Sequence, residues 1–155
     1  MTDYTIRLAR ADETSVVVHH RSAMFLDMGV DPTLVKESEP LVYEWVKSRT
    51  ASGIYTGFFA VTTDDTPIAG AGLSLLDWIP GPGVPQVTRG YVLNVYTEPE
   101  HRHRGLASLL VQRCVTHCRE NGISTVSIHA SDMGRSVYEK LGFSPTNEMR
   151  IRLRL

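Results

Sequence analysis

Apolar residues in the first third of the chain recur at two spacings, one typical of strands and one typical of helices. Alternating apolar and polar side chains predict a strand at residues 4–8. Helical spacing then predicts one helix over residues 12–28, between a capping aspartate and a glycine stop, and a second over residues 32–49. Pro40 falls inside the second helix, where we expect an interruption or a kink.

The middle of the chain has the shorter, strand-like period. Runs rich in aromatic and β-branched residues at 54–62 and 67–76 flank a short polar turn, and we expect them to form a hairpin. Residues 78–85 hold three prolines and two glycines, so they can continue neither a strand nor a helix. This segment is either a flap over a cleft or a passive connection.

Strands and helices are interleaved in the rest of the chain. We expect a buried strand at 90–97, an amphipathic helix at 106–121, a short strand at 125–128 and a short helix at 133–140. Residues 149–155 alternate strictly between apolar and basic side chains, which predicts a final strand with one apolar and one basic face. This order indicates an α/β layered structure.

Length and charge limit the possible functions. A chain of 155 residues fits one domain, residues 1–155, that needs no disulfide or metal to fold. Sixteen basic against seventeen acidic residues leave a net charge of −1, so no excess of positive charge favours nucleic acid. The sequence opens without a basic region and an apolar run, and no stretch approaches eighteen apolar residues. We therefore expect a cytoplasmic protein that does not enter a membrane.

The cysteines and clustered histidines do not predict a metal site. Cys114, His117 and Cys118 lie within five residues of one predicted helix, so they cannot close a tetrahedral zinc site alone, and core packing is the better interpretation. Two cysteines this close on one helix face do not indicate a disulfide framework. We interpret His19 and His20 as surface residues or as the edge of a substrate pocket.

The segment Arg102-His103-Arg104-Gly105 joins the strand at 90–97 to the helix that follows it. The first turn of a helix presents unpaired N–H groups and a partial positive charge, and so it binds phosphate well. Gly105 has no Cβ, which lets a ligand approach the backbone closely. The turn therefore predicts a pyrophosphate site.

Two motifs together resemble the GNAT superfamily of N-acetyltransferases. Arg102-x-x-Gly105-x-Ala107 is similar to that superfamily's acetyl-CoA signature, and the segment 137–143, Val-Tyr-Glu-Lys-Leu-Gly-Phe, is similar to its Tyr-x-Lys-x-Gly-Phe segment. The predicted order of elements fits the superfamily along nearly the whole chain. The resemblance implies a mixed, mostly antiparallel central sheet flanked by helices, in which two central strands splay apart to admit acetyl-CoA.

The resemblance also implies which residues bind acetyl-CoA, the co-substrate. Backbone amides of the turn and the helix start would hold the pyrophosphate, and one strand's backbone would pair with the pantetheine and direct an N–H at the thioester oxygen. Ser131 stands where the family often has a cofactor-binding asparagine, although it is equally well placed as a helix N-cap. The implied cofactor-binding residues are Val95, Tyr96, Thr97, Arg102, His103, Arg104, Gly105, Leu106, Ala107, Ser108, Ser131 and Tyr138. Arg104 is expected to reach the phosphates with its side chain.

Tyr138 falls where the family carries a tyrosine near the cofactor sulfur. A phenol with an ordinary pKa of about 10 stays protonated at neutral pH, so it can supply the proton that the leaving thiolate needs. The resemblance makes Tyr138 the general acid, and the alternative is a core tyrosine on a short helix.

The sequence offers several candidates for the general base. Glu98 follows the central strand, His129 ends the next strand and Asp77 precedes the proline- and glycine-rich loop. The ordinary pKa of histidine suits proton transfer near neutral pH. Attack by an already deprotonated amine is the further alternative.

Asn94 and Trp78 are candidates for the acceptor pocket, because an amide inside an apolar strand must find a partner. We expect an acetyl-CoA-dependent N-acetyltransferase that acts by direct attack in a ternary complex, without a metal, on a primary amine of a small molecule. A protein or peptide acceptor, and a non-catalytic acyl-CoA-binding regulator, are the alternatives. A homodimer is compatible with this expectation.

Overall fold

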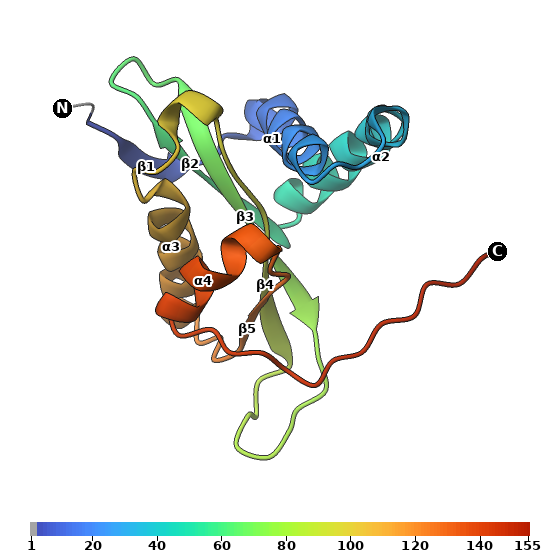
Figure 1. Ribbon diagram of the computed structural model, residues 1–155. Helices are drawn as coiled ribbons and strands as arrows, with labels where there is room; N and C mark the ends of the chain where they lie inside the picture. Colours follow the sequence, from blue (N-terminus) through green and yellow to red (C-terminus); the bar gives the residue numbers. More distant parts are fainter. Residues whose placement is uncertain (1–2) are drawn as a thin grey trace.

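One mixed sheet forms the centre of the protein, whose computed structural model describes residues 3–155 (Figure 1). Its strands lie in the order β1-β2-β3-β4-β5, and neighbours are antiparallel except for the parallel pair β4 and β5. The strands are β1 Thr5–Leu8, β2 Tyr55–Val61, β3 Pro67–Asp77, β4 Thr88–Thr97 and β5 Val126–Ile128. The predicted α/β layered fold with a mostly antiparallel sheet is confirmed.

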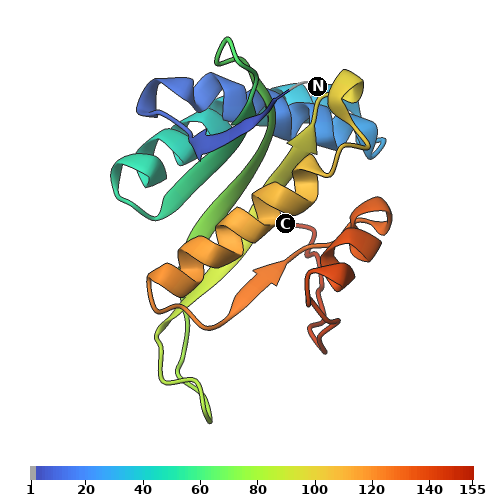
Figure 2. The same ribbon diagram turned by 90° about the vertical axis from the view of Figure 1, so that its left-hand side faces the viewer.

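Helices cover both faces of this sheet. Helices α1 and α2 pack on one face, whereas α3 and α4 lie on the other (Figures 1 and 2). The helices are α1 Thr14–Asp27, α2 Pro32–Ala51, α3 Leu106–Glu120 and α4 Asp132–Lys140, with short 3-10 turns at η1 Ala11–Glu13 and η2 Pro99–His101. No helix within residues 3–155 combines the length and the hydropathy needed to cross a membrane.

Each helical layer has its own buried cluster. Leu110, Val111 and Cys114 of α3 pack on the strands without exposed surface. On the other face, Val17 of α1 and Val46 of α2 pack with aromatic residues of β2. Two separate clusters on one sheet make this a three-layer structure.

Helix α2 is continuous through Pro40, so the expected interruption is not seen. Its start is well defined, because Asp31 accepts a hydrogen bond from the Thr33 N–H at 2.8 Å and Pro32 occupies the first turn. Pro40 removes one N–H from the interior of the helix, but it lies on the exposed face, where water can bind the carbonyl left without a donor.

Strands β4 and β5 separate after a short paired region. Their pairing covers Gly90–Val92 on β4 and ends at Val92 opposite Ile128, so no strand within residues 3–155 pairs with this edge of β4 at residues 93–97. On its other side β4 carries a bulge, since the register with β3 shifts between Gly70 and Gly72. The bulge lies where the two strands part.

The predicted strand at 149–155 is wrong for this chain alone, because residues 144–155 form neither helix nor strand. The segment runs away from the body of the protein (Figure 1). A strand needs a neighbour for its backbone hydrogen bonds, and this segment lies beside none in its own chain.

Residues 78–87 connect β3 to β4 at the end of the sheet far from α1 and α2 (Figure 1). A bridge between Gly81 and Val84 closes the tip of this loop. Of the two alternatives, flap or connection, the position favours a connection, because the loop does not reach the turn at residues 102–105.

Candidate active site

The turn before α3 has an unusual backbone. His103 and Gly105 have φ values of 61° and 76°, in the left-handed region, whereas Arg104 does not. Left-handed residues that alternate with ordinary ones direct successive N–H groups into a shared concavity, which suits an anion. A Cβ added at Gly105 would contact nothing within 4 Å, so the space beside the turn is open.

Helix α3 begins at this turn without a side-chain cap. Its first regular hydrogen bond runs from the Leu109 N–H to the Gly105 carbonyl at 3.1 Å. The N–H groups of residues 106–108 therefore have no acceptor within the helix. Together with the helix dipole, these free N–H groups have the chemistry that suits a phosphate group.

The two arginines of the turn are both held by the protein. Arg102 donates from Nε to the Thr97 carbonyl at 2.9 Å, pairs with Asp27 of α1 and lies over the Tyr96 ring. Arg104 donates to the Tyr4 hydroxyl and to the Glu100 carbonyl. Both side chains therefore have partners within the protein, and the expectation that Arg104 reaches the phosphates stays a prediction.

Asn94 occupies the bulge of β4 with a φ of 56°. Its buried amide accepts a hydrogen bond from Arg21 Nη1 at 2.6 Å and donates to the Tyr55 hydroxyl at 3.4 Å. The sequence alone points to this amide but not to Arg21. The two positions are 73 residues apart, and neither local pattern indicates the other. Residues 95–97 continue along the unpaired edge toward the turn.

Tyr138 is buried in the cluster on the α3 side of the sheet, and its side chain packs over Gly134. A Cβ at position 134 would come within 2.8 Å of the Tyr138 ring, so this ring position requires glycine there. Burial raises the pKa of Tyr138, which keeps its hydroxyl protonated at neutral pH. Ser131 accepts a hydrogen bond from the Gly134 N–H at 3.2 Å, which confirms it as the N-cap of α4.

Glu98 directly follows β4 on the α1 side of the sheet, where three ring side chains lie close to it. His19 Nε2 lies 2.7 Å from Glu98 Oε1, and the Tyr96 hydroxyl donates to Oε2 at 3.2 Å. His20 Nε2 is 3.9 Å from the same carboxylate. This cluster joins α1 to the end of β4.

His20 is 2% exposed, and neither of its ring nitrogens has a hydrogen-bond partner within residues 3–155. Burial lowers the pKa of His20 to about 4, although the nearby Glu98 partly opposes this shift. The ring borders a cavity of about 10 Å³ that Asn94 and Tyr55 also line. His20 is therefore a neutral, buried residue, while its neighbour His19 is exposed.

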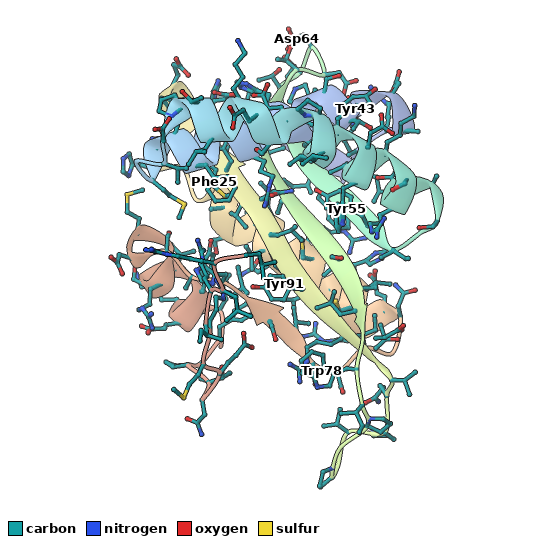
Figure 3. All side chains as sticks on the ribbon, turned by 90° about the vertical axis from the view of Figure 1, so that its right-hand side faces the viewer. Phe25, Tyr43, Tyr55, Asp64, Trp78 and Tyr91 are labelled. Carbon is teal, nitrogen blue, oxygen red and sulfur yellow. The ribbon has the colours of Figure 1, made fainter. Side chains whose placement is uncertain are left out.

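The other predicted site residues lie apart from this cluster. His129 is exposed at the end of β5, where Arg150 Nη2 approaches its Nδ1 at 3.5 Å. Trp78 lies 4.0 Å from the Arg89 guanidinium at the far end of β3, opposite Asp64 in Figure 3. Asp77 pairs with Thr88, which places it and Trp78 about 20 Å along the strand from Asn94.

The cysteines belong to the core. Cys114 and Cys118 are both fully buried on α3, as the helix pattern predicts. Burial raises the pKa of Cys114 to about 12, so its thiol is not a nucleophile at neutral pH. Within residues 3–155 no group of three side chains is arranged to hold a metal ion.

Comparison with known proteins identifies the family. The model of the acetyltransferase (GNAT) family matches residues 21–143. A GCN5-related N-acetyltransferase from Ralstonia eutropha JMP134 is 35% identical and superposes with a TM-score of 0.91 over 97% of this chain and 99% of its own. A predicted acetyltransferase with acetyl-CoA from Clostridium acetobutylicum is 27% identical, with a TM-score of 0.89 over 98% and 96%.

A more distant neighbour shares the fold alone. Glucosamine-6-phosphate N-acetyltransferase from Arabidopsis thaliana is 14% identical, with a TM-score of 0.69 over 97% of this chain and 98% of its own. The search of curated proteins found no match. The family match over residues 21–143, the two nearer structures and the uncapped helix beside a splayed strand together establish that this chain belongs to the GNAT family and is an acetyl-CoA-dependent N-acetyltransferase.

Proposed function

We propose that this acetyltransferase acts on a primary amine of a small molecule, which attacks directly in a ternary complex. The observation that supports direct transfer from bound acetyl-CoA is the unpaired edge of β4 at residues 93–97, which leads to the uncapped start of α3. One element can pair with an extended chain and the other binds a pyrophosphate, and acetyl-CoA has both parts. When bound, acetyl-CoA supplies an activated acetyl group.

The residues that hold acetyl-CoA act mainly through their backbone. Groups of Val95, Tyr96 and Thr97 pair with the pantetheine, and one N–H of this edge stabilises negative charge on the acetyl oxygen during attack. The amides from His103 to Ser108 hold the pyrophosphate. Arg102 serves by fixing the turn to the end of β4 and to α1. Ser131, already the cap of α4, lies at the start of the helix that carries Tyr138.

Tyr138 is the general acid. Its raised pKa keeps the proton on the hydroxyl until the thiolate leaves. It lies in the cluster on the α3 side of the sheet, whereas Glu98 contacts α1 on the opposite side. Acid and base on opposite sides suit a reaction in which the amine and the thiol occupy opposite sides of the acetyl group.

Glu98 is the general base, with His129 as the second candidate. Hydrogen bonds to His19 and Tyr96 fix the Glu98 carboxylate beside β4, whereas His129 is exposed and meets only an arginine. We expect Glu98→Gln to lower kcat/KM about 100-fold and His129→Gln to change it less than twofold in steady-state assays. The reverse pattern would assign the base to His129.

A thiol-release assay tests the proposed function. We expect release of CoA with at least one class in a panel of small primary amines, and slower release with peptide N-termini and lysine side chains. Faster turnover of peptides would show that the acceptor is a protein or a peptide. Binding of acetyl-CoA by calorimetry, with no release from any acceptor, would instead favour a non-catalytic acyl-CoA-binding regulator.

A further inference from the structure

Arg21 of α1 is a partly buried cation that contacts the bulge of β4. Its Nη1 donates to Asn94 Oδ1 at 2.6 Å, and its guanidinium lies 4.8 Å from the centre of the Phe25 ring. Figure 3 labels Phe25 on the side of the helical pair that faces α4. Arg21 therefore lies beside Asn94, in the part of β4 that has no pairing with β5.

Arg21 has no ion-pair partner among the residues that the structure describes. Within residues 3–155 no carboxylate lies within ion-pair distance of it, and its contacts are an amide and an aromatic ring. Arg7 and Arg102 differ in this respect, since Arg7 binds Glu13 and Asp65 and Arg102 binds Asp27. Burial lowers the pKa of Arg21, which reflects the cost of keeping this charge partly away from water.

We propose, resting on the function above, that the acceptor amine also carries an acidic group, a carboxylate or a phosphate, which Arg21 binds. A half-buried guanidinium without a counter-ion gains most from an anionic ligand, because its five donors match carboxylate and phosphate oxygens. Glu98, four residues beyond Asn94 on the chain, offers the opposite charge. The two residues fit an acceptor that has an amine and an acid.

The proposal is tested by measuring CoA release with pairs of acceptors that differ only in the acidic group. Amino acids are compared with their carboxamides, and amino sugar phosphates with the unphosphorylated sugars, so the two arms separate carboxylate from phosphate. We expect the acidic member of one series to have a kcat/KM about 10- to 100-fold higher. Arg21→Met should reduce that preference to less than threefold, while the Kd of acetyl-CoA stays unchanged.

Two variants serve as controls. Arg21→Lys should keep part of the preference, because the charge remains without the planar fork. Arg49→Met should keep all of it, since Arg49 also stacks on an aromatic ring but lies on α2. Equal turnover of acids and their neutral partners, or a preference that survives in Arg21→Met, would overturn the proposal. Release of CoA from no amine at all would instead count against the proposed function.

Discussion

At the scale of single residues, the hydroxyl of Tyr138 combines burial with a raised pKa. Tyr138→Phe removes the proton that the leaving thiolate takes up but keeps the ring that packs on Gly134. We expect kcat to fall about 100-fold, with the Kd of acetyl-CoA nearly unchanged. Steady-state CoA release and calorimetry measure the two quantities.

Tyr43→Phe is the matched control for this prediction. Tyr43 lies on α2, away from the turn and the β4 edge (Figure 3), so its variant should keep the wild-type kcat. If Tyr138→Phe also keeps the wild-type kcat, Tyr138 is a core tyrosine and not the acid.

The sequence predicts that Asn94 has a buried partner but does not identify that partner. An amide in an apolar strand predicts a buried partner, and the structure supplies Arg21 and Tyr55. The sequence could identify the need for a partner, because that follows from burial of one polar group. It could not identify the partners, because they come from α1 and β2, which meet β4 only after folding.

At the scale of elements, the start of α3 depends on a left-handed glycine. Gly105→Ala places a Cβ on a residue with a φ of 76°, which costs about 1–2 kcal/mol and disturbs the N–H groups of the turn. We expect acetyl-CoA binding to weaken about tenfold, as measured by calorimetry.

Gly122→Ala separates this effect from general strain. Gly122 follows the other end of α3 with a φ of 70°, and a Cβ there also has open space. Its variant should lose similar stability and keep the wild-type Kd for acetyl-CoA. Equal weakening in both variants would mean that strain in α3, and not the turn, controls binding.

The elements that the sequence predicted well are those with a local cause. Periodicity and turn residues located the hairpin of β2 and β3 and both helices after β4, because each pattern lies within one segment. The strand at 149–155 failed because a strand requires a partner edge, which periodicity does not supply. Pro40 was expected to interrupt or kink α2, but the helix continues through it, because the effect depends on which side of the helix faces water.

At the scale of the whole molecule, His20 links stability to pH. Its pKa is about 4 in the folded protein, against an ordinary value near 6.5 when unfolded. Between these values the unfolded chain binds a proton that the folded protein does not, so stability falls as pH drops from about 6.5 to 4. The loss amounts to about 3 kcal/mol.

Urea unfolding of the wild type and His20→Gln at pH 7 and pH 4.5 measures this contribution. The free energy of unfolding should drop more in the wild type than in the variant, because glutamine does not titrate and other groups are common to both. The same drop in both proteins would show that His20 takes up its proton without loss of stability.

The sequence by itself determined most of the elements, the turn before α3 and the family resemblance, since each rests on neighbours along the chain. Only the tertiary structure decided which face of the sheet each candidate occupies. It brought Glu98 to His19 and Arg21 to Asn94, held Arg104 on Tyr4 and left Trp78 at the far end of β3. These contacts join residues distant in the chain, and their geometry is set by the packing of helices on a splayed sheet.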